Sequence, residues 1–323
     1  MHSISRRGFV ISAATAGAAF GLDGPLEFIG SAFAQSNPAL VEKGFVKFKV
    51  GDVDVTQIYD GIWNRELQDG FVKNAALADV QVALKAAGLA ENIVPIPFTV
   101  TAVTIGGKTT LIDSGTGVPG QVQPSAGLAA AKNLAAAGID PGSIENIVVT
   151  HFHPDHISGL MAKDTNAELF AKATIHVPAP ELAWWTGPSV PQAGQGLANR
   201  IKATLGTWKN VKAFEGEPEV VPGIRAIATP GHTMGHTSYH VGSGSQQLII
   251  QGDITNIPAL FARNPGWHGS FDTDGVLAEA TRRKMFDRAI ADKATITGYH
   301  YGMPGAGTIA KDGNGYVFTA ISA

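Results

Sequence analysis

Short apolar runs recur along the chain, and the first of them occur in pairs separated by tight turns. Residues 45–50 and 53–59 are rich in valine and aromatic side chains and flank Gly51-Asp52. Residues 98–105 and 109–112 flank Gly106-Gly107 in a similar way. Because β-branched and aromatic residues favour strands and such turns favour hairpins, the pattern predicts two β-hairpins.

Longer segments have the spacing of helices. Residues 75–87 alternate apolar and polar side chains at helical intervals, and residues 128–137 are rich in alanine. Residues 274–291 predict a long helix with Thr273 or Asp274 near its N-cap, since these side chains accept hydrogen bonds from the first turn.

Further apolar runs predict short strands at residues 146–149, 173–177, 224–228, 248–250 and 295–297. Strand hairpins followed by helices occur in both halves of the chain. This order favours two sheets packed together with helices outside, which is an α/β fold. No linker, repeat or low-complexity block divides the chain, so we expect one domain.

The densest polar cluster follows the apolar run Ile147-Val148-Val149 and has the sequence Thr-His-Phe-His-Pro-Asp-His at residues 150–156. His151 and His153 are two apart, so in an extended chain they point to the same side. Asp155 and His156 follow the turn at Pro154 and can face a different point. Imidazole and carboxylate groups bind zinc and related divalent metals, so one loop could serve two metal ions. The alternative is a polar surface loop with a chance cluster.

Three later segments repeat the order strand, glycine, ligand. They are residues 229–237, with His232 and His236, the pair Gly252-Asp253, and Gly298-Tyr299-His300. Each follows a short apolar run, so all of these loops could emerge at one edge of a sheet sandwich. Glycine lets the backbone approach a metal closely.

Composition limits the chemistry. The 323 residues carry a formal net charge of −3, which is too weak to indicate a nucleic-acid partner. No cysteine is present, which excludes disulfides, thiolate ligands and a cysteine nucleophile. A metal site must therefore use His, Asp or Glu.

The N-terminal segment has the pattern of an export signal. Arg6-Arg7 precedes an apolar, Ala/Gly-rich run at residues 11–22, and Ala32-Phe33-Ala34 resembles a cleavage site. The run is short and glycine-rich for a membrane anchor, which is the alternative. We expect residues 1–34 to be a twin-arginine signal that engages the twin-arginine export machinery, and residues 35–323 to be a periplasmic or secreted domain without stable membrane insertion.

The combined motifs His-x-His-x-Asp-His, Pro-Gly-His-Thr-x-Gly-His, Gly-Asp and a late His resemble those of the metallo-β-lactamase superfamily. Residues 111–115, Leu-Ile-Asp-Ser-Gly, also resemble an early element of that family. The resemblance implies an αββα four-layer sandwich with a dinuclear metal site at one sheet edge. It implies the following ligands: His151, His153 and His232 for one metal, Asp155, His156 and His300 for the other, and Asp253 between them. Asp113 and His236 would be supporting residues.

Local features resemble the methyl parathion hydrolase group within that superfamily. They include residues 52–61, the run His-Thr-Ser-Tyr at 236–239, and Met303-Pro304-Gly305 after His300. That resemblance implies an exported, often dimeric hydrolase of aryl esters, lactones and some organophosphate triesters. It also implies that Trp185 lines a leaving-group pocket, with helix packing as the alternative. Phe261, Phe271 and Met303 are further pocket candidates because they are close in sequence to Asp253 or His300.

Two metal ions, with zinc as first choice and manganese, cobalt or iron as alternatives, would share a water and lower its pKa toward neutrality. Asp155 could pass a proton to the leaving group, and Asp253 would hold both metals. We expect a hydrolase of small carboxylic esters or lactones that uses this bridging hydroxide, with promiscuous organophosphate hydrolysis.

The alternatives are a β-lactam hydrolase, a dedicated organophosphate hydrolase and a non-catalytic binding protein. Typical acyl-homoserine lactonases have a tyrosine where this chain has Asn256, and residues 115–121 and 196–201 lack the aromatics of organophosphate specialists.

Overall fold

The computed structural model describes residues 36–119, 121–122, 127 and 129–322. The predicted export signal at residues 1–34 lies outside the described residues, and the described residues belong to one compact unit. In this part of the chain, no helix combines the length and the apolar character needed to cross a membrane.

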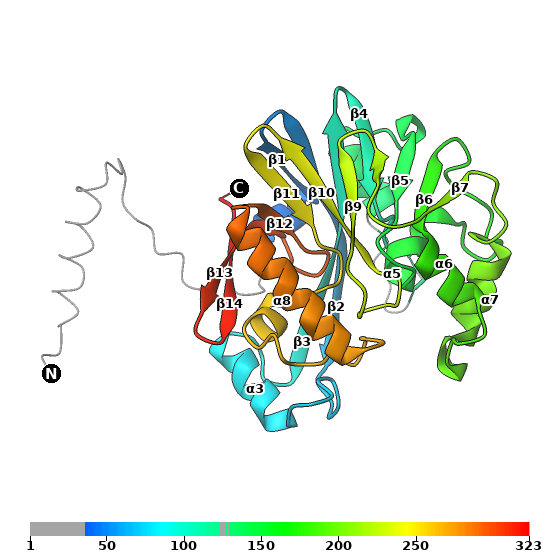
Figure 1. Ribbon diagram of the computed structural model, residues 1–323. Coiled ribbons are helices and arrows are strands. Elements are labelled where there is room, and N and C mark those ends of the chain that lie inside the picture. The colour runs from blue at the N-terminus through cyan, green and yellow to red at the C-terminus, as the bar shows by residue number, and fades with distance from the viewer. Residues whose placement is uncertain (1–35, 120, 123–126, 128, 323) are drawn as a thin grey trace, which may run out of the picture. The chain divides into compact units, whose positions relative to one another are not determined.

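Two seven-stranded sheets form the centre of the fold (Figure 1). The first sheet has the order β1-β2-β3-β4-β5-β6-β7: β1 (Phe45–Val50), β2 (Val53–Glu66), β3 (Ile93–Ile105), β4 (Lys108–Ile112), β5 (Asn146–Val148), β6 (Thr174–Pro178) and β7 (Val211–Phe214). The second has the order β14-β13-β12-β11-β10-β9-β8: β8 (Glu219–Val221), β9 (Ile224–Ala228), β10 (Thr237–Ser243), β11 (Gln246–Ile250), β12 (Thr295–Thr297), β13 (Ala306–Asp312) and β14 (Gly315–Ala320).

Alternate side chains of each strand enter different apolar layers, because successive residues of a strand point to opposite faces. Val148 of β5 and Ile250 of β11 belong to the cluster between the sheets, which contains residues of both. Their neighbours Ile147 and Ile249 belong to two separate outer clusters. The sheets therefore pack face to face, and each has a second buried face outside.

Helices cover these outer faces. Val80 of α3 (Leu77–Ala86), Trp185 of α6 (Ala179–Thr186) and Ile201 of α7 (Gln195–Ala203) pack on the first sheet. Helix α8 (Gly275–Ala291) lies over the second sheet (Figure 1). Its Phe286 belongs to the outer apolar cluster of that sheet. The layer order helix, sheet, sheet, helix confirms the predicted αββα sandwich. The remaining helical segments are short: α2 (Pro38–Lys43), α4 (Leu134–Ala136), α5 (Pro154–Ile157), and turns at Ala129–Asn133, Pro141–Ser143, Ser158–Leu160, Gln192–Gly194 and Pro258–Ala262.

The long predicted helix has the expected start. Asp274 is the N-cap of α8, and its carboxylate accepts a hydrogen bond of 3.0 Å from the backbone N–H of Leu277. The predicted helix at residues 128–137 is different, because its described part begins as a π-helical turn and only ends as α-helix. Hydrogen bonds to strand β2 fix the position of this segment. Asp60 accepts from the backbone N–H of Ala129 at 2.7 Å, and the Asn133 side chain donates to the carbonyl of Tyr59 at 2.6 Å.

Strands β2 and β3 extend beyond their predicted ends at residues 59 and 98. The register shifts between Tyr59 and Gly61, after which Trp63 pairs with Ile96 and Arg65 with Val94. Prolines at positions 95 and 97 interrupt the strand pattern in the sequence, since proline cannot donate to the ladder. The result is a two-stranded extension that carries apolar side chains toward the candidate site.

The strand directions bring the ligand loops to one edge. β4 and β5 are parallel neighbours, as are β11 and β12. β9 and β11 each pair antiparallel with β10, so they run in the same direction as each other. The loops after β9, β11 and β12 therefore leave the same edge of the second sheet, as those after β4 and β5 do in the first sheet.

Candidate metal centre

Asp113 holds the loop that carries most candidate ligands. It follows β4 with a positive φ of 63°, and its carboxylate accepts from the backbone N–H of Thr150 at 2.7 Å and from the Thr150 hydroxyl at 2.8 Å. The same carboxylate contacts Nδ1 of His156 at 2.8 Å. Asp113 is 1% exposed, so this buried carboxylate fixes both the loop and one imidazole ring.

Three imidazole nitrogens meet at one point. Nδ1 of His153 lies 3.0 Å from Nε2 of His151 and 3.0 Å from Nε2 of His232. Nitrogens that share one tetrahedral zinc at its usual bond length are about 3.3 Å apart. The three rings therefore have the spacing of one metal site, and they match the trio inferred from the sequence.

A second group lies beside the first. Pro154 starts α5, so Asp155 and His156 lie in its first turn, and His300 enters from the loop after β12. Oδ2 of Asp155 is 3.5 Å from Nε2 of His156 and 3.6 Å from Nε2 of His300. This trio also corresponds to the predicted ligands of one metal.

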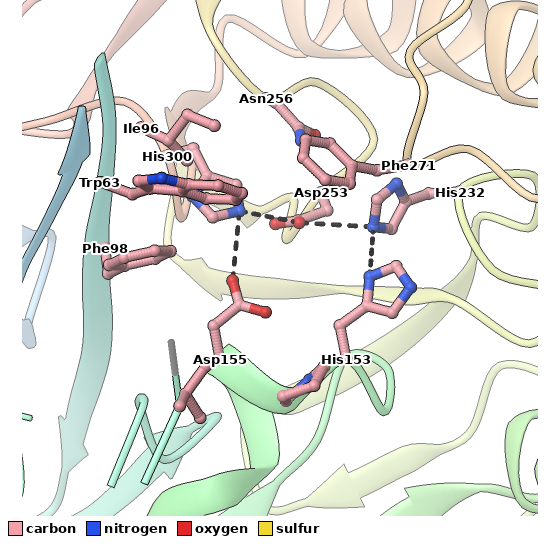
Figure 2. A pocket seen from close by; sticks show the side chains of 12 residues that line it. Trp63, Ile96, Phe98, His153, Asp155, His232, Asp253, Asn256, Phe271 and His300 are labelled. Atoms are coloured by element: carbon pink, nitrogen blue, oxygen red, sulfur yellow. Dashed lines mark hydrogen bonds and ion pairs between the residues drawn. The ribbon is translucent and has the colours of Figure 1, made fainter. Parts of the chain in front are cut away.

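Asp253 stands between the two groups (Figure 2). Its Oδ2 is 2.9 Å from Nε2 of His300, 3.4 Å from Nε2 of His156, 3.4 Å from Nε2 of His232 and 3.9 Å from Nε2 of His151. A single carboxylate oxygen thus borders both groups, which is the position required of a ligand shared by two cations.

Four of the rings are held from behind through Nδ1. The contacts are His151 to the Thr150 hydroxyl at 3.0 Å, His156 to Asp113 at 2.8 Å, His232 to Asp272 at 3.0 Å, and His300 to the carbonyl of Pro97 at 2.8 Å. A hydrogen bond at Nδ1 leaves the lone pair of Nε2 directed at the centre. These partners fix the tautomer that a metal ligand needs.

Two buried atoms at the centre lack a hydrogen-bond partner among the described residues. Nε2 of His156 and Oδ1 of Asp253 are buried and make no hydrogen bond with the described residues. Leaving such atoms unpaired costs about 1–3 kcal/mol each. A donor set of imidazole nitrogens and carboxylate oxygens, with buried lone pairs facing one another, fits divalent cations such as zinc.

Electrostatics favours the metal-binding protonation states of His153 and Asp155. Burial, with help from His232, lowers the pKa of His153 to about 3, so its ring is neutral at pH 7. Burial raises the pKa of Asp155, but His156 and His300 outweigh it and leave the pKa at about 2. Neutral imidazole and ionised carboxylate are the forms that bind metals. At His156 and His300 burial lowers the pKa, but Asp253 and Asp155 outweigh it and raise the pKa, so a metal must displace a proton from these two rings.

His236 serves a different purpose from the other histidines. Its Nε2 accepts from the backbone N–H of Asp253 at 3.0 Å, and its Nδ1 contacts the hydroxyl of Thr229 at 2.9 Å. Burial lowers the pKa of His236 to about 3, so the ring stays a neutral acceptor. His236 therefore ties the Asp253 loop to the loop after β9; the family resemblance implied a supporting residue at this position.

A cavity of about 210 Å³ opens above the two groups (Figure 2). Its lining includes Trp63, Ile96, Phe98, Val122, His153, Pro154, Asp155, His232, Asp253, Asn256, Phe271 and His300. This is below the roughly 300–1,000 Å³ of sites for drug-sized ligands, so it suits a small reacting group. Its walls are largely apolar and aromatic around one polar floor.

Of the four pocket candidates, only Phe271 lines this cavity. Trp185 is 4% exposed and lies behind His153, with its indole N–H donating to Glu181 at 2.8 Å. Phe261 packs against Phe71 in the outer core of the first sheet.

Met303 is buried in a separate cluster with Leu40, Val46 and Tyr59. For Trp185, Phe261 and Met303, the prediction of a place in the pocket is therefore corrected to core packing. Closeness in sequence to a ligand does not decide which side of the backbone a side chain takes.

The aromatic wall that sequence reasoning missed comes from the extension of β2 and β3. Trp63 and Phe98 face the cavity from these strands (Figure 2). A signal was present: residues 94, 96 and 98 are apolar at strand spacing, and only the intervening prolines obscured it. Asp272 and Glu181 were also missed, since a lone carboxylate in a sequence has no distinguishing pattern.

Comparison with known proteins agrees with this geometry. A sequence profile of the Metallo-beta-lactamase superfamily matches residues 97–297, and the chain belongs to this superfamily. Among curated relatives, an N-acyl homoserine lactonase of a Bacillus species is 32% identical over 152 residues, which are 47% of this chain and 54% of the relative. The hydroxyacylglutathione hydrolase of Pseudomonas entomophila (strain L48) is 31% identical over 136 residues, which are 41% of this chain and 40% of the relative. The chain thus spans only about half the length of these relatives.

Two solved structures are similar over most of the chain. AidC, described as a dizinc quorum-quenching lactonase, has a TM-score of 0.79 and 25% identity, covering 87% of this chain and 98% of AidC. The hydrolase AbOPH, described as in the beta lactamase superfamily, has a TM-score of 0.78 and 26% identity, with the same coverage of 87% and 98%.

Proposed function

We propose that the protein is a dinuclear metal-dependent hydrolase of small carboxylic esters or lactones. The observation that carries this proposal is the position of Asp253, whose Oδ2 lies within 3.9 Å of four imidazole nitrogens that belong to two ligand trios. When bound, two divalent cations lower the pKa of a water between them and polarise the scissile carbonyl. We take zinc as the first choice, with manganese, cobalt or iron as alternatives.

The residues of the chain supply orientation and proton transfer. The Asp155 side chain is 18% exposed and faces the cavity as a carboxylate, so it can accept a proton during the reaction and pass it on to an alkoxide leaving group. Asp253 is almost fully buried, at 3% exposure, and fixes the distance between the two trios. The apolar walls exclude competing water. The similarity to a dizinc lactonase supports lactones among the substrates.

A second candidate activity is hydrolysis of aryl organophosphate triesters. Trp63, Phe98 and Phe271 surround the cavity and offer flat apolar surfaces to an aryl leaving group. The expectation of a pocket poor in aromatics came from residues 115–121 and 196–201, whereas the aromatics of the wall come from elsewhere. Placement near the methyl parathion hydrolase group remains our proposal and rests on the local motifs.

Export remains part of the proposal as well. From the twin-arginine pattern we propose a periplasmic or secreted protein, and from the resembling group a homodimer. Replacing Arg6 and Arg7 by lysine should retain the protein in the cytoplasm, as measured by cell fractionation. Unchanged export of that variant would contradict the proposed route.

A substrate panel tests the activity. The zinc-loaded protein should hydrolyse p-nitrophenyl acetate and a γ-lactone, and methyl paraoxon more slowly. A chelator should abolish each activity and added zinc should restore it. Full activity after exhaustive metal removal would contradict the proposal, and nitrocefin turnover far above that of the esters would favour a β-lactam hydrolase.

A further inference from the structure

Arg65 lines a shallow hollow next to the cavity. It is two residues after Trp63 on β2, so both side chains project from the same face of the strand. Trp63 and Phe271 line the cavity above the metal centre, and both also line an adjacent shallow hollow together with Arg65, Glu66 and Gln68. A ligand that extends from the cavity past these two rings therefore reaches Arg65.

Aromatic rings hold the guanidinium group in place. Its central carbon is 4.9 Å from the ring centre of Phe271, 5.1 Å from that of Trp63 and 5.3 Å from that of Phe71. Cation–π contacts of this kind do not use the N–H groups as hydrogen-bond donors. The rings thus fix the position of a cation without satisfying its hydrogen-bond donors.

Arg65 differs in this respect from the other arginines that the structure describes. Each of the others donates to an oxygen: Arg200 to Asn166, Arg225 to Glu217, Arg263 to Asp312, Arg282 to Ile254, Arg283 to Glu279 and Arg288 to Asp292. Among the described residues, the Arg65 side chain has ring contacts and neither a hydrogen bond nor an ion pair.

A positive charge in this setting favours an anionic ligand. Burial against the rings lowers the pKa of Arg65, which reflects lost hydration, although the group remains charged at neutral pH. A partly desolvated cation with free N–H edges gains most from a carboxylate, which matches it with two parallel hydrogen bonds.

We propose that Arg65 anchors a carboxylate carried by the substrate, distant from the ester or lactone carbonyl that reacts at the metal centre. This inference rests on the proposed hydrolase function. Arg65 lines the adjacent hollow and not the cavity over the metal centre, so an apolar chain of several methylenes must link the two groups. Trp63 and Ile96, which pair across β2 and β3, provide an apolar path for that chain. The substrate class is therefore an ester or lactone with an ω-carboxylate on an apolar acyl chain.

The test uses two esters that differ only at the far end. Mono-p-nitrophenyl adipate carries a terminal carboxylate, and p-nitrophenyl hexanoate has the same chain length without it. Half esters of succinate and suberate vary the spacing. The zinc-loaded wild type is compared with Arg65→Met, which keeps length without charge, and with Arg65→Lys, which keeps charge without the planar fork. Arg288→Met is the matched control, since it removes one positive charge from a surface ion pair away from the cavity lining.

We expect kcat/KM of the wild type to favour the adipate ester by about tenfold, the size of one charge-assisted pair. Arg65→Met should lose this preference because its KM for the adipate ester rises much more than its KM for the hexanoate ester. Arg65→Lys should retain part of the preference and Arg288→Met all of it. Equal losses on both esters would show that Arg65 only supports the rings, and would overturn the proposal, as would a wild type without preference.

Direct binding separates this inference from the proposed function. If the zinc-loaded wild type hydrolyses neither ester, the hydrolase proposal fails. Calorimetric binding of adipate and hexanoate then still tests the anchor: adipate should bind the wild type more tightly than hexanoate, and Arg65→Met should remove the difference. Identical affinities in the two proteins would overturn the anchor alone.

Discussion

At the scale of single residues, four of the five ligand histidines depend on a partner behind the ring. The Asp272 carboxylate contacts Nδ1 of His232 at 3.0 Å and also accepts from the backbone N–H of Gly269 at 3.0 Å. Nη2 of Arg282 lies 3.6 Å from Oδ2 of the Asp272 carboxylate. Asp272 is thus held in turn, and His232 has one orientation available.

Replacing Asp272 with asparagine should weaken zinc binding by about 10–100-fold, because the ring loses a charged partner that orients it. Competition against a chromophoric chelator measures the affinity. Asp287→Asn, which removes an exposed carboxylate paired with Lys311, is the control and should bind zinc as the wild type does. Unaltered zinc affinity of Asp272→Asn would contradict the orienting role.

Glu181 is a second residue of this kind. Its carboxylate is buried and accepts from the N–H groups of Phe152 and Gly235, the hydroxyl of Thr233 and the indole of Trp185, at 2.8–2.9 Å. Burial raises the pKa of Glu181, and these donors oppose the increase. One carboxylate thereby joins the loop after β5 to the loop after β9.

Glu181→Gln places an amide NH2 group, which is a donor, against N–H and O–H groups that also donate. Because these buried donors lose their acceptor, we expect a loss of about 2 kcal/mol in the free energy of unfolding. Urea denaturation measures it. Glu145→Gln, at an exposed ion pair with Lys108, should change stability by less than about 1 kcal/mol. Equal effects of the two substitutions would show that the Glu181 network contributes little.

At the scale of elements, sequence reasoning was right where local chemistry decides the structure. Apolar runs flanked by glycine turns gave β1 to β4, and Asp274 marked the start of α8. The ligand loops were identifiable because metal binding requires His and Asp at fixed positions. The pairing of Trp63 with Ile96 was not identifiable from the sequence, because the two strand segments lie some thirty residues apart. The prolines on either side of Ile96 also obscure the strand pattern there.

The N-cap of α8 offers a test at this scale. Asp274→Ala should lower the free energy of unfolding by about 1 kcal/mol, because the N–H of Leu277 loses its acceptor. Asp274→Asn keeps a side-chain acceptor and should stay close to the wild type. Thermal or urea unfolding of the three proteins distinguishes them; equal stability of the alanine variant would mean that water replaces the cap without cost.

At the scale of the whole molecule, the candidate centre joins the two sheets. The loop after β5 in the first sheet carries His151, His153, Asp155 and His156, whereas loops of the second sheet carry His232, Asp253 and His300. Close to the centre, the Tyr239 hydroxyl of β10 donates to the carbonyl of Val149 at 2.6 Å and links the sheets directly. Packing between the sheets therefore sets the spacing of the ligands.

Removal of metal should consequently destabilise the entire fold. A ligand that binds only the native state stabilises it by about 4 kcal/mol at a thousand times its dissociation constant. We expect a chelator to lower the melting temperature by several degrees and zinc to restore it, as measured by calorimetry. An unchanged melting temperature after verified metal removal would contradict a centre shared by both sheets.

The division of ligands between the sheets also bears on how the protein matures. A chain in which only one sheet has formed presents an incomplete set of donors, so it retains metal poorly. If the proposed metal centre is correct, metal capture would be a late event that follows the docking of the two halves, and occupancy of the centre would report that docking is complete. Metal occupancy would thus distinguish fully folded molecules from partly folded ones.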